Sequence, residues 1–386
     1  MRARNLLIAA VALAGCRDAV EPKASNPSAL VSVPAPYEIV ELGTLGGSSS
    51  QALAINDQTQ IVGNSSTASG ATHAFLWEGG VMRDLGTLGG DFSTAADINA
   101  NGDVAGVSTD STGASRVTLW RGGVPQDLGP AVGGAGFMHL GDGGHVVWAA
   151  STPDGRHAML WDGFQVTDLG TLGGTISYPM AVNALGQITG ASTTATGQTH
   201  AFLWDNGGMI DLGTFGGTYS EGIDLNISGA VTGAALDAAG KQRAFHWFEG
   251  QMTDLGALPG DTFGTGMGVS SSDQVIGISY PDQGAVRKHA FIWELGVMRP
   301  LRVDYQELSV SDDRVGAIND NGQVIGRWIE RTIISHPWVW ENGVVKDLPT
   351  LAGGGGVTAI NNPGQIIGWI VDASHQLRAV LWRRTS

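Results

Sequence analysis

The sequence has little of several things that common protein classes need. It holds 386 residues but a single cysteine, Cys16, so no disulfide can form within the chain. Charged residues make up only 15%, and 36 Asp and Glu outnumber 21 Lys and Arg, which gives a net charge of −15. Nucleic-acid binding depends on cations that neutralise phosphates, so this composition disfavours it. The acidic balance is explained more simply as a means of keeping the surface soluble.

The apolar run near the start, Leu6 to Leu13, is too short to cross a bilayer, which takes about 20 residues. It follows Arg2 and Arg4 and leads directly into the sequence LAGC, which ends at Cys16. This combination resembles a bacterial lipoprotein signal, with residues 1–15 as the cleaved peptide. The resemblance implies a lipid on the Cys16 thiol, and Arg17 in place of Asp favours the outer membrane or cell surface. A plain cleavable signal, in which Cys16 is incidental, is the alternative.

Residues 16–36 predict a lipidated cysteine and a flexible tether. This segment carries four prolines, small polar residues and no periodic apolar pattern. Such a tether would hold the folded part away from a membrane. The repeats begin after it, so residues 37–386 form the predicted folded domain.

Eight tryptophans mark a repeat of about 43 residues. Their spacings are 43, 41, 43, 43, 46, 47 and 42 residues, and the best-preserved copies carry Asp-Leu-Gly-Thr-Leu-Gly-Gly, Ile-Asn and Gln-Ile-x-Gly, or close versions of them, before the tryptophan. A period this long is typical of a solenoid or a propeller. The repeated tryptophans, which define copies one to eight, are Trp77, Trp120, Trp161, Trp204, Trp247, Trp293, Trp340 and Trp382.

Turn signals within each copy predict four strands. An asparagine such as Asn56 precedes a polar stretch and then an apolar run, which indicates two strands joined by an Asx-type turn. The run that ends in tryptophan is the third strand. Pairs such as Asn206-Gly207 follow it and predict a tight hairpin, which would place each tryptophan opposite an apolar residue five positions later.

These elements predict an all-β, eight-bladed β-propeller of four-stranded antiparallel blades. The last copy stops shortly after Trp382 and lacks its fourth strand, whereas residues 37–43 match a fourth strand with no third strand before it. The N-terminal strand is therefore predicted to complete the last blade and close the ring, which removes the exposed edges. A solenoid would need caps, and neither end resembles one.

The repeat resembles a known family, the HAF-repeat or probable extracellular repeat family, named for His-Ala-Phe. Residues 73–77, 200–204 and 289–293 carry that motif with the tryptophan almost letter for letter, and the resemblance covers residues 37–386. It implies an extracytoplasmic location and no defined biochemical activity. Many family members end in a sorting segment with Pro-Glu-Pro, and Arg383-Arg384-Thr385-Ser386 does not match it. The lipid at Cys16 would then replace that route.

Recurring histidines and acids are the first candidates for chemistry. Histidine stands four residues before tryptophan in five copies, as at His73, and arginine replaces it at Arg116, Arg243 and Arg378. Arginine does not ligate zinc, so a structural hydrogen-bond donor suits every copy and no metal or cofactor is predicted. Acids such as Asp84 open the Leu-Gly segment and are predicted to be turn acceptors, for which the His or Arg column offers partners.

No catalytic signature appears in the repeats. The Gly-Gly segments are not followed by Lys-Ser or Lys-Thr, there is no Gly-x-Ser-x-Gly, and the sole cysteine lies in the leader. No catalytic residue is therefore assigned. Copies three and seven depart from the repeat, copy three with Gly141 and Trp148 in place of its Asn and Gly. Candidate ligand-binding residues come from copy seven: Asp304, Tyr305, Glu307, Trp328 and Trp338.

The sequence thus predicts a non-catalytic, lipid-anchored binding or scaffold module for an envelope protein or polysaccharide. A carbohydrate-active hydrolase or lyase with its site in copy seven is the first alternative, because aromatics and carboxylates together can bind and cleave a glycan. A purely structural spacer is the second.

Overall fold

A computed structural model describes residues 33–34, 36–131, 138–284, 288–301, 310–330, 334–351 and 353–385. All regular structure in these ranges is β, which confirms the predicted all-β class, and residues Ser32–Ser386 form one compact unit. None of these described segments contains a helix long and apolar enough to span a membrane. The predicted signal peptide, Cys16 and most of the tether lie outside the described residues.

Each copy of the repeat folds into consecutive antiparallel strands. The strands of copies one to four are β3 (Gly46–Ile55), β4 (Ile61–Thr67), β5 (Thr72–Glu78), β6 (Val81–Asp84); β7 (Gly89–Ile98), β8 (Val104–Asp110), β9 (Ser115–Arg121), β10 (Val124–Pro130); β11 (His139–Leu140), β12 (Val146–Thr152), β13 (Gly155–Trp161), β14 (Val166–Asp168); and β15 (Gly173–Val182), β16 (Ile188–Thr194), β17 (Thr199–Asp205), β18 (Gly208–Gly213).

The remaining copies follow the same pattern. Their strands are β19 (Gly216–Leu225), β20 (Val231–Asp237), β21 (Gln242–Phe248), β22 (Gln251–Asp254); β23 (Phe263–Val269), β24 (Val275–Tyr280), β25 (His289–Glu294), β26 (Val297–Pro300); β27 (Val310–Ile318), β28 (Val324–Glu330), β29 (Ser335–Glu341), β30 (Val344–Asp347); and β31 (Gly355–Ile360), β32 (Ile366–Val371), β33 (Leu377–Arg384).

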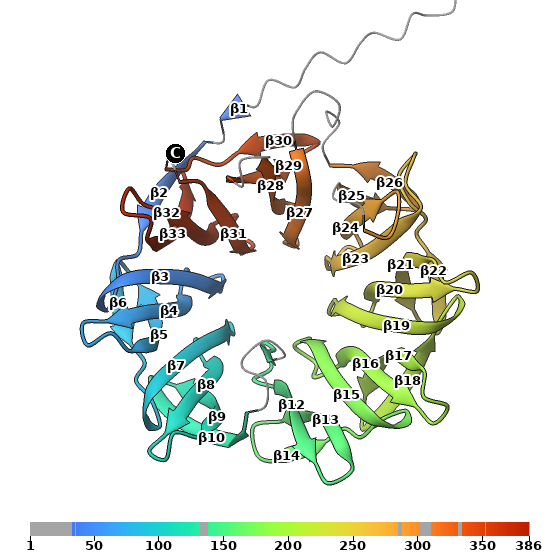
Figure 1. The fold of residues 1–386 in the computed structure, drawn as a ribbon, viewed down its shortest axis with the longest axis horizontal. Coiled ribbons are helices and arrows are strands. Elements are labelled where there is room, and N and C mark those ends of the chain that lie inside the picture. Colours follow the sequence, from blue (N-terminus) through green and yellow to red (C-terminus); the bar gives the residue numbers. More distant parts are fainter. Residues whose placement is uncertain are drawn as a thin grey trace, which may run out of the picture. The chain divides into compact units, whose positions relative to one another are not determined.

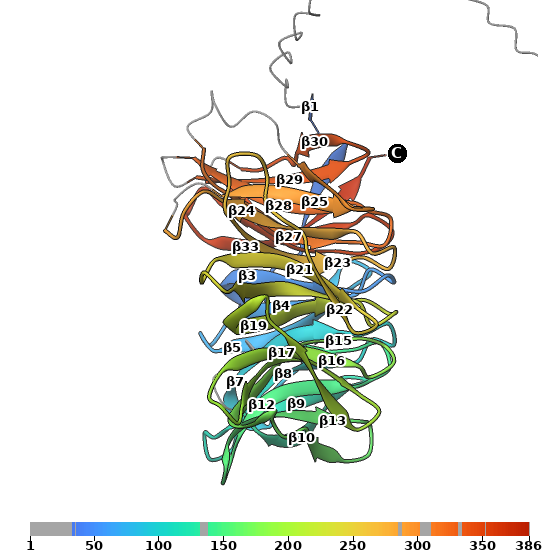
Figure 2. The same cartoon turned by 90° about the vertical axis from the view of Figure 1, so that its right-hand side faces the viewer.

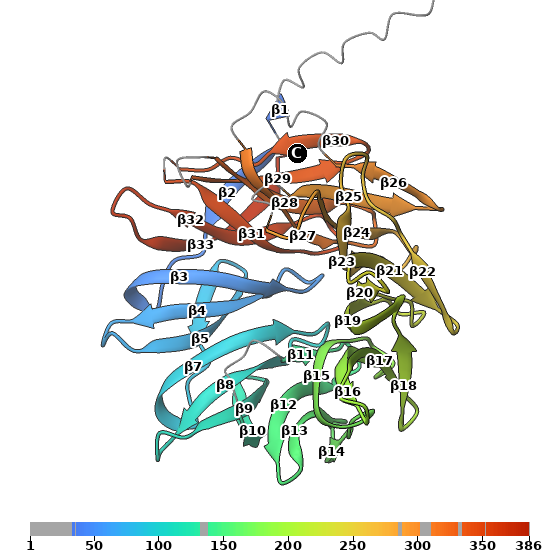
Figure 3. The same cartoon turned by 45° about the vertical axis from the view of Figure 1, so that its right-hand side comes forward.

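The four-stranded units follow one another around a common centre (Figure 1). The first strand of a copy, such as β7 or β19, lies nearest that centre, and the last strand, such as β10 or β22, lies on the outside; Figure 3 shows the same order. Because successive strands alternate in direction, the turn after the first strand and the hairpin after the third strand lie at the same end of the unit. The other two connections lie at the opposite end.

The predicted register of the hairpins is confirmed. Trp77 lies directly opposite Met82, and Trp120 opposite Pro125, each five positions later in the chain. The same pairing holds in the next five copies, and it places a large indole against an apolar neighbour on the next strand. These pairs are Trp161–Val166, Trp204–Met209, Trp247–Met252, Trp293–Met298 and Trp340–Val345.

The two ends of the compact unit meet in one sheet. Strand β2 (Tyr37–Glu41) pairs antiparallel with β33, so that Ile39 lies opposite Trp382. Figure 1 shows β2 beside the last strands of the chain, and Figure 2 shows β1 next to β30. The short strand β1 (Val33–Pro34) pairs in parallel with β30. Strand β1 therefore lies inside the range that the sequence assigns to the tether.

The hydrophobic core lies between neighbouring copies. Each cluster of buried apolar side chains draws on two adjacent copies, as where Leu203 of copy four meets Val231 and Phe245 of copy five. Copies eight and one share such a cluster too, in which Ile367 and Leu381 pack with residues of copy one. Burying large aliphatic and aromatic side chains stabilises a fold by about 1.5 to 3 kcal/mol each, so each copy depends on both neighbours.

Copy three departs from this pattern. In regular copies the glycine of Gln-Ile-x-Gly lies against the first strand, and a Cβ on Gly190 would stand 2.1 Å from the carbonyl oxygen of Tyr178. In copy three the first strand, β11, has only two residues, and Trp148 takes the glycine's place. Its side chain is buried in the hydrophobic cluster that copies two and three share, which also contains Val107. Copy seven, in contrast, has all four strands.

Candidate functional site

The turns that follow the first strand of each copy form the most elaborate polar structure in the molecule. In copy one, the Asn56 side-chain oxygen accepts hydrogen bonds from the backbone N–H groups of Gln58 and Gln60, at 3.1 and 3.0 Å. This is the predicted Asx turn. The same two bonds form on the asparagines of copies two, four, five and seven, and the second of them forms in copy eight: Asn99, Asn183, Asn226, Asn319 and Asn361.

Most of these asparagines also connect neighbouring copies, a role that the sequence interpretation missed. The Asn56 Nδ2 donates to the carbonyl oxygen of Asn99, at 3.0 Å. Asn319 donates to the carbonyl of Asn361 at 2.9 Å, and Asn361 donates to that of Asn56 at 3.0 Å. We call this series the asparagine ladder. It runs without a break through copies seven, eight, one and two.

The asparagine ladder is interrupted at copies three and six. Copy three has Gly141 in the asparagine position, and the Nδ2 of buried Asn99 has no hydrogen-bond partner within the described part of the chain. Copy six has Ser270, whose carbonyl accepts from Asn226 at 3.0 Å. The Ser270 hydroxyl interacts with Ser272 at 3.1 Å within its own turn. Its side chain therefore does not extend the ladder to Asn319.

At these two interruptions, a carboxylate side chain connects one copy to the next. Asp97 accepts a hydrogen bond from the Leu140 N–H at 3.0 Å, just before Gly141, and Asp224 accepts one from the Val269 N–H at 2.9 Å, just before Ser270. Each also accepts from the N–H of the next residue in its own strand. Burial raises the pKa of both carboxyl groups to about 6, against the opposing effect of these bonds.

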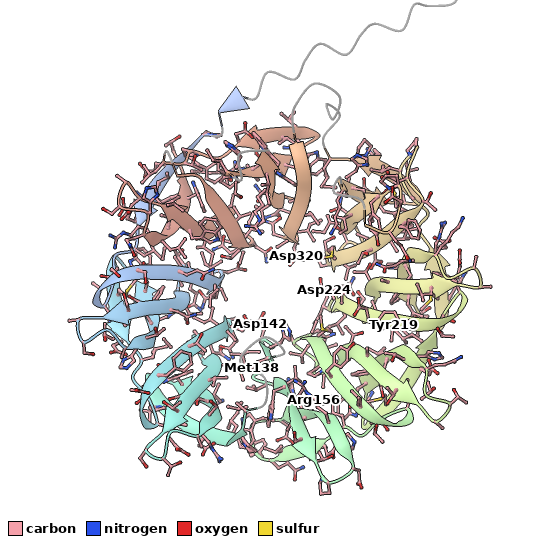
Figure 4. All side chains as sticks on the ribbon, in the orientation of Figure 1. Met138, Asp142, Arg156, Tyr219, Asp224 and Asp320 are labelled. Carbon is pink, nitrogen blue, oxygen red and sulfur yellow. The ribbon has the colours of Figure 1, made fainter. Side chains whose placement is uncertain are left out.

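A cavity of about 240 Å³ lies among the turns of copies one, two, three, seven and eight. Its walls combine carboxylates and amides with four isoleucines. Its principal lining residues are Ile55, Asp57, Ile98, Asp142, Ile318, Asp320, Ile360 and Asn362. Figure 4 shows the labelled Asp142 and Asp320 approaching the centre of the unit from different copies.

Hydrogen bonds between copies fix the polar groups of this cavity. The Asn362 amide Nδ2 lies 3.2 Å from both Asp57 and Asp320 carboxylates, and the Asn362 N–H donates to Asp57 at 2.9 Å. Asp142 accepts from the Ala100 N–H at 2.8 Å. Each carboxylate has lone pairs left over, so the cavity can accept hydrogen bonds from hydroxyl or amino groups of a ligand.

The recurring histidines and acids lie at the opposite end and pair with one another. His73 Nδ1 lies 2.8 Å from Oδ2 of Asp84, and Oδ1 of the same carboxylate accepts from the Gly86 N–H at 2.7 Å. Arginine serves equally well, because Arg116 pairs with Asp127 at 2.8 Å. These pairs hold the third strand of a copy to the end of its fourth. Equivalent pairs are His157–Asp168, His200–Asp211 and Arg243–Asp254.

Of the five candidate ligand residues of copy seven, the structure describes two, Trp328 and Trp338. Asp304, Tyr305 and Glu307 lie outside the described residues. Trp338 is 0% exposed and packs in the core, so its proposed role as a ligand contact is wrong. The Trp328 ring stacks on His336 with centroids 3.9 Å apart. Within the described ranges, no group of three or more His, Cys, Asp or Glu could hold a metal ion.

One feature of the sequence could have indicated the two buried carboxylates, which were not predicted. Asp97 and Asp224 stand directly before the Ile-Asn or Leu-Asn pair, where other copies have alanine or glycine at Ala54, Ala181 and Gly268. A carboxylate in a column of small residues indicates a buried polar contact. Its partner could not be deduced, because it belongs to the next copy.

Comparison with known proteins supports the fold. The chain is similar to a dipeptidyl peptidase 4 from Porphyromonas gingivalis, with a TM-score of 0.51 and 9% identity over 88% of this chain and 58% of that one. An acylaminoacyl peptidase from Pyrococcus horikoshii gives a TM-score of 0.50 and 8% identity over 84% and 58%. The β-propeller domain of the Trilobed protease from Pyrococcus furiosus gives 0.49 and 10% over 76% and 94%.

The arrangement of four-stranded antiparallel units around a common centre is that of a β-propeller. The chain spans 58% of the length of the two peptidases. Sequence identity as low as theirs supports a shared fold and no shared function. No family model matches the chain, and no curated protein matches it in sequence. Function therefore has to be argued from the propeller's own surfaces.

Proposed function

We propose that this protein is a non-catalytic binding module, an eight-bladed propeller whose ring the strand β2 closes and whose turn-lined cavity receives a polar ligand. The cavity carries this proposal. Four isoleucines supply apolar surface, and Asp57, Asp142 and Asp320 supply acceptors that hydrogen bonds hold in place, so the cavity can orient a polar ligand. A hydroxyl-rich group, such as the end of a polysaccharide, is the ligand class that suits these acceptors.

The pairing of the recurring histidines and acids supports a binding rather than a catalytic role. A pair such as His157–Asp168 is repeated in several copies, and arginine can take the place of histidine. An acid–base catalyst needs one residue pair with a distinct environment, whereas these pairs share a structural task. The alternative of a hydrolase in copy seven depends on Asp304 and Glu307, which lie outside the described residues, so it stays a prediction.

The wider setting of this proposal comes from the sequence. The lipoprotein-like signal would anchor the protein through Cys16, and residues 17–36 would tether the propeller at the outer membrane or cell surface. The HAF-repeat resemblance agrees with an extracytoplasmic location. A polysaccharide or a protein of the envelope is the expected partner.

A glycan and envelope-protein binding screen with the full chain tests this function. The matched variants are Asp57→Asn with Asp320→Asn, which alters the cavity, and Asp91→Asn with Asp154→Asn, which removes two exposed charges elsewhere. We expect a glycan that binds the native chain and the second variant but binds the first at least about tenfold more weakly, the loss of about 1.4 kcal/mol. A glycan that binds all three equally would contradict the cavity as the site, and the absence of any binding would favour a spacer.

A further inference from the structure

The hairpin turns at the cavity end of the propeller differ sharply between copies. Copies one, two, four, five and seven place glycine, asparagine or glutamate followed by glycine at the two turn positions, as in Gly79-Gly80 and Asn342-Gly343. Copy three has Phe164 at the second position, 91% exposed, and copy six has Leu295 at the first, 94% exposed. Two large apolar side chains thus stand where the other five copies have glycine, asparagine or glutamate; Glu249 shares the left-handed φ of Leu295, 47° against 50°.

The backbone shows that folding alone does not favour leucine at position 295. Leu295 has φ of 50°, in the left-handed region where glycine and asparagine are normal and where another residue costs about 1 kcal/mol or more. In copy three Gly163 supplies the positive φ, 98°, so that Phe164 need not. A hydrophobic residue held in a strained, solvent-exposed turn indicates a role outside the fold.

The Asx turns of the intervening copies carry apolar residues as well. Leu185 of copy four is 68% exposed and Ile227 of copy five is 45% exposed. They lie at the same end as the hairpins: in copy six the Gln274 side chain of the Asx turn donates to the hairpin carboxylate of Glu294 at 2.9 Å. We call Phe164, Leu185, Ile227 and Leu295 the apolar arc; it extends over four consecutive copies.

The charges around the apolar arc have one predominant sign. The hairpins carry Asp162, Asp205, Glu249 and Glu294, and the Asx turns and hairpins of copies three to six contain one arginine, Arg299, and no lysine. Arg299 lies 3.1 Å from the Glu294 carboxylate. A second copy of this acidic chain or an anionic bilayer would be repelled, whereas a cationic partner would be attracted.

We propose that the apolar arc docks a basic segment of a partner protein, one that combines lysine or arginine with large apolar side chains. Phe164 and Leu295 would be the apolar anchors, and the surrounding carboxylates would pair with the cations. The inference rests on the proposed binding function, but it assigns a second surface that uses none of the cavity residues.

The test uses the full chain and three synthetic peptides of equal length: alternating lysine and leucine, glutamate and leucine, and lysine and serine. Peptide fluorescence anisotropy is measured for the native chain, Leu295→Asn, Phe164→Gly and the control Val124→Ser, an exposed hairpin residue of copy two. We expect only the lysine and leucine peptide to bind well, and each arc variant to weaken it about fivefold or more, while Val124→Ser changes it little.

Several results would overturn the proposal. These are no binding of the lysine and leucine peptide, equal binding of the glutamate and leucine peptide, or equal affinity of the arc variants and Val124→Ser. Native chain that binds vesicles of phosphatidylcholine and phosphatidylglycerol, with loss in Leu295→Asn, would assign the apolar arc to a lipid surface instead.

Two further measurements distinguish lost binding from lost folding, and the apolar arc from the cavity. The urea midpoint of Leu295→Asn should not fall, because asparagine suits the turn, so lost binding cannot be attributed to unfolding. The Asp57→Asn, Asp320→Asn variant should retain peptide binding. If the native chain bound the peptide but no glycan, the result would count against the cavity proposal alone. If it bound a glycan at the cavity but not the peptide, the result would count against the apolar arc alone.

Discussion

The cavity end of the propeller has two unlike halves. In copies seven, eight, one and two, the asparagine ladder is continuous and the turns carry polar residues such as Asp57, Asp320 and Asn362. In copies three to six the ladder is interrupted twice and apolar side chains replace polar ones. We call the first half the polar arc, in contrast to the apolar arc.

The comparison shows how a symmetric scaffold becomes specific. A ring of identical turns offers the same environment many times, and a single ligand needs an environment that occurs once. The polar arc remains close to the repeat and relies on it for rigidity. The interruptions of the ladder coincide with the copies that present Phe164 and Leu295. The departures from the repeat are therefore concentrated in the copies that the proposed partner would contact.

The largest expected effect comes from cutting the asparagine ladder in the polar arc. Asn361→Ala removes the acceptor of the Asx turn and the donor bond to the carbonyl of Asn56. Because these groups are buried, we expect the free energy of unfolding to fall by about 2 to 4 kcal/mol, measured by urea denaturation. Asn321→Ala, which removes one exposed bond, is the control and should cost no more than about 0.5 kcal/mol. Equal losses would mean that the ladder adds nothing special.

The next effect concerns the carboxylates at the interruptions. Their pKa in the folded state is about 6 against 3.8 ordinarily, so between about pH 4 and 6 the folded chain holds protons that the unfolded chain releases. The free energy of unfolding should therefore fall as pH rises through this window, by on the order of 1 to 3 kcal/mol per carboxyl group.

Urea midpoints between pH 4 and 7 check this effect. The variant Asp97→Asn with Asp224→Asn lacks the titrating groups, so its stability should fall less steeply with pH than that of the native chain. Asp91→Asn with Asp154→Asn should follow the native curve. Parallel curves for all three proteins would show that the buried carboxyl groups do not titrate in this range.

A smaller effect, with opposite sign, is expected in the apolar arc. Leu295→Asn relieves the backbone strain at φ of 50° and should raise the free energy of unfolding by about 1 kcal/mol. Thermal or urea denaturation measures it. Asn342→Leu, the reverse change at the same turn position of copy seven, should lower stability by a similar amount. If both variants matched the native chain, strain would not distinguish the two arcs.

The smallest effect would come from restoring the ladder in copy six. Ser270→Asn should allow the new amide to donate to the carbonyl of Asn319, as Asn226 does to Ser270, for a gain of about 0.5 kcal/mol. Gly141→Asn should not give a similar gain, because a Cβ there would stand 2.7 Å from the carbonyl oxygen of Asn183. A loss of stability in Ser270→Asn would show that copy six follows a different geometry.

Contacts within one copy were predictable, and contacts between copies were not. The tryptophan register followed from hairpin chemistry, since a two-residue turn fixes which residues oppose each other, and Trp77 and Met82 do so. The asparagines were correctly placed in turns for the same reason. Their second bonds, to the next copy, depend on how the blades pack, as does the burial of Trp338 that excluded it as a ligand contact.

The sequence by itself determined the repeat, its four strands, its turns and the all-β class, because each of these depends on residues close together in the chain. Only the tertiary structure decided which polar groups meet. It brought Asp57, Asp142 and Asp320 to one cavity, placed Asp97 and Asp224 at the interruptions of the ladder, and set Phe164 and Leu295 at the same end. The physical reason is that these groups come from different copies, and their separation is set by blade packing rather than by local backbone preference.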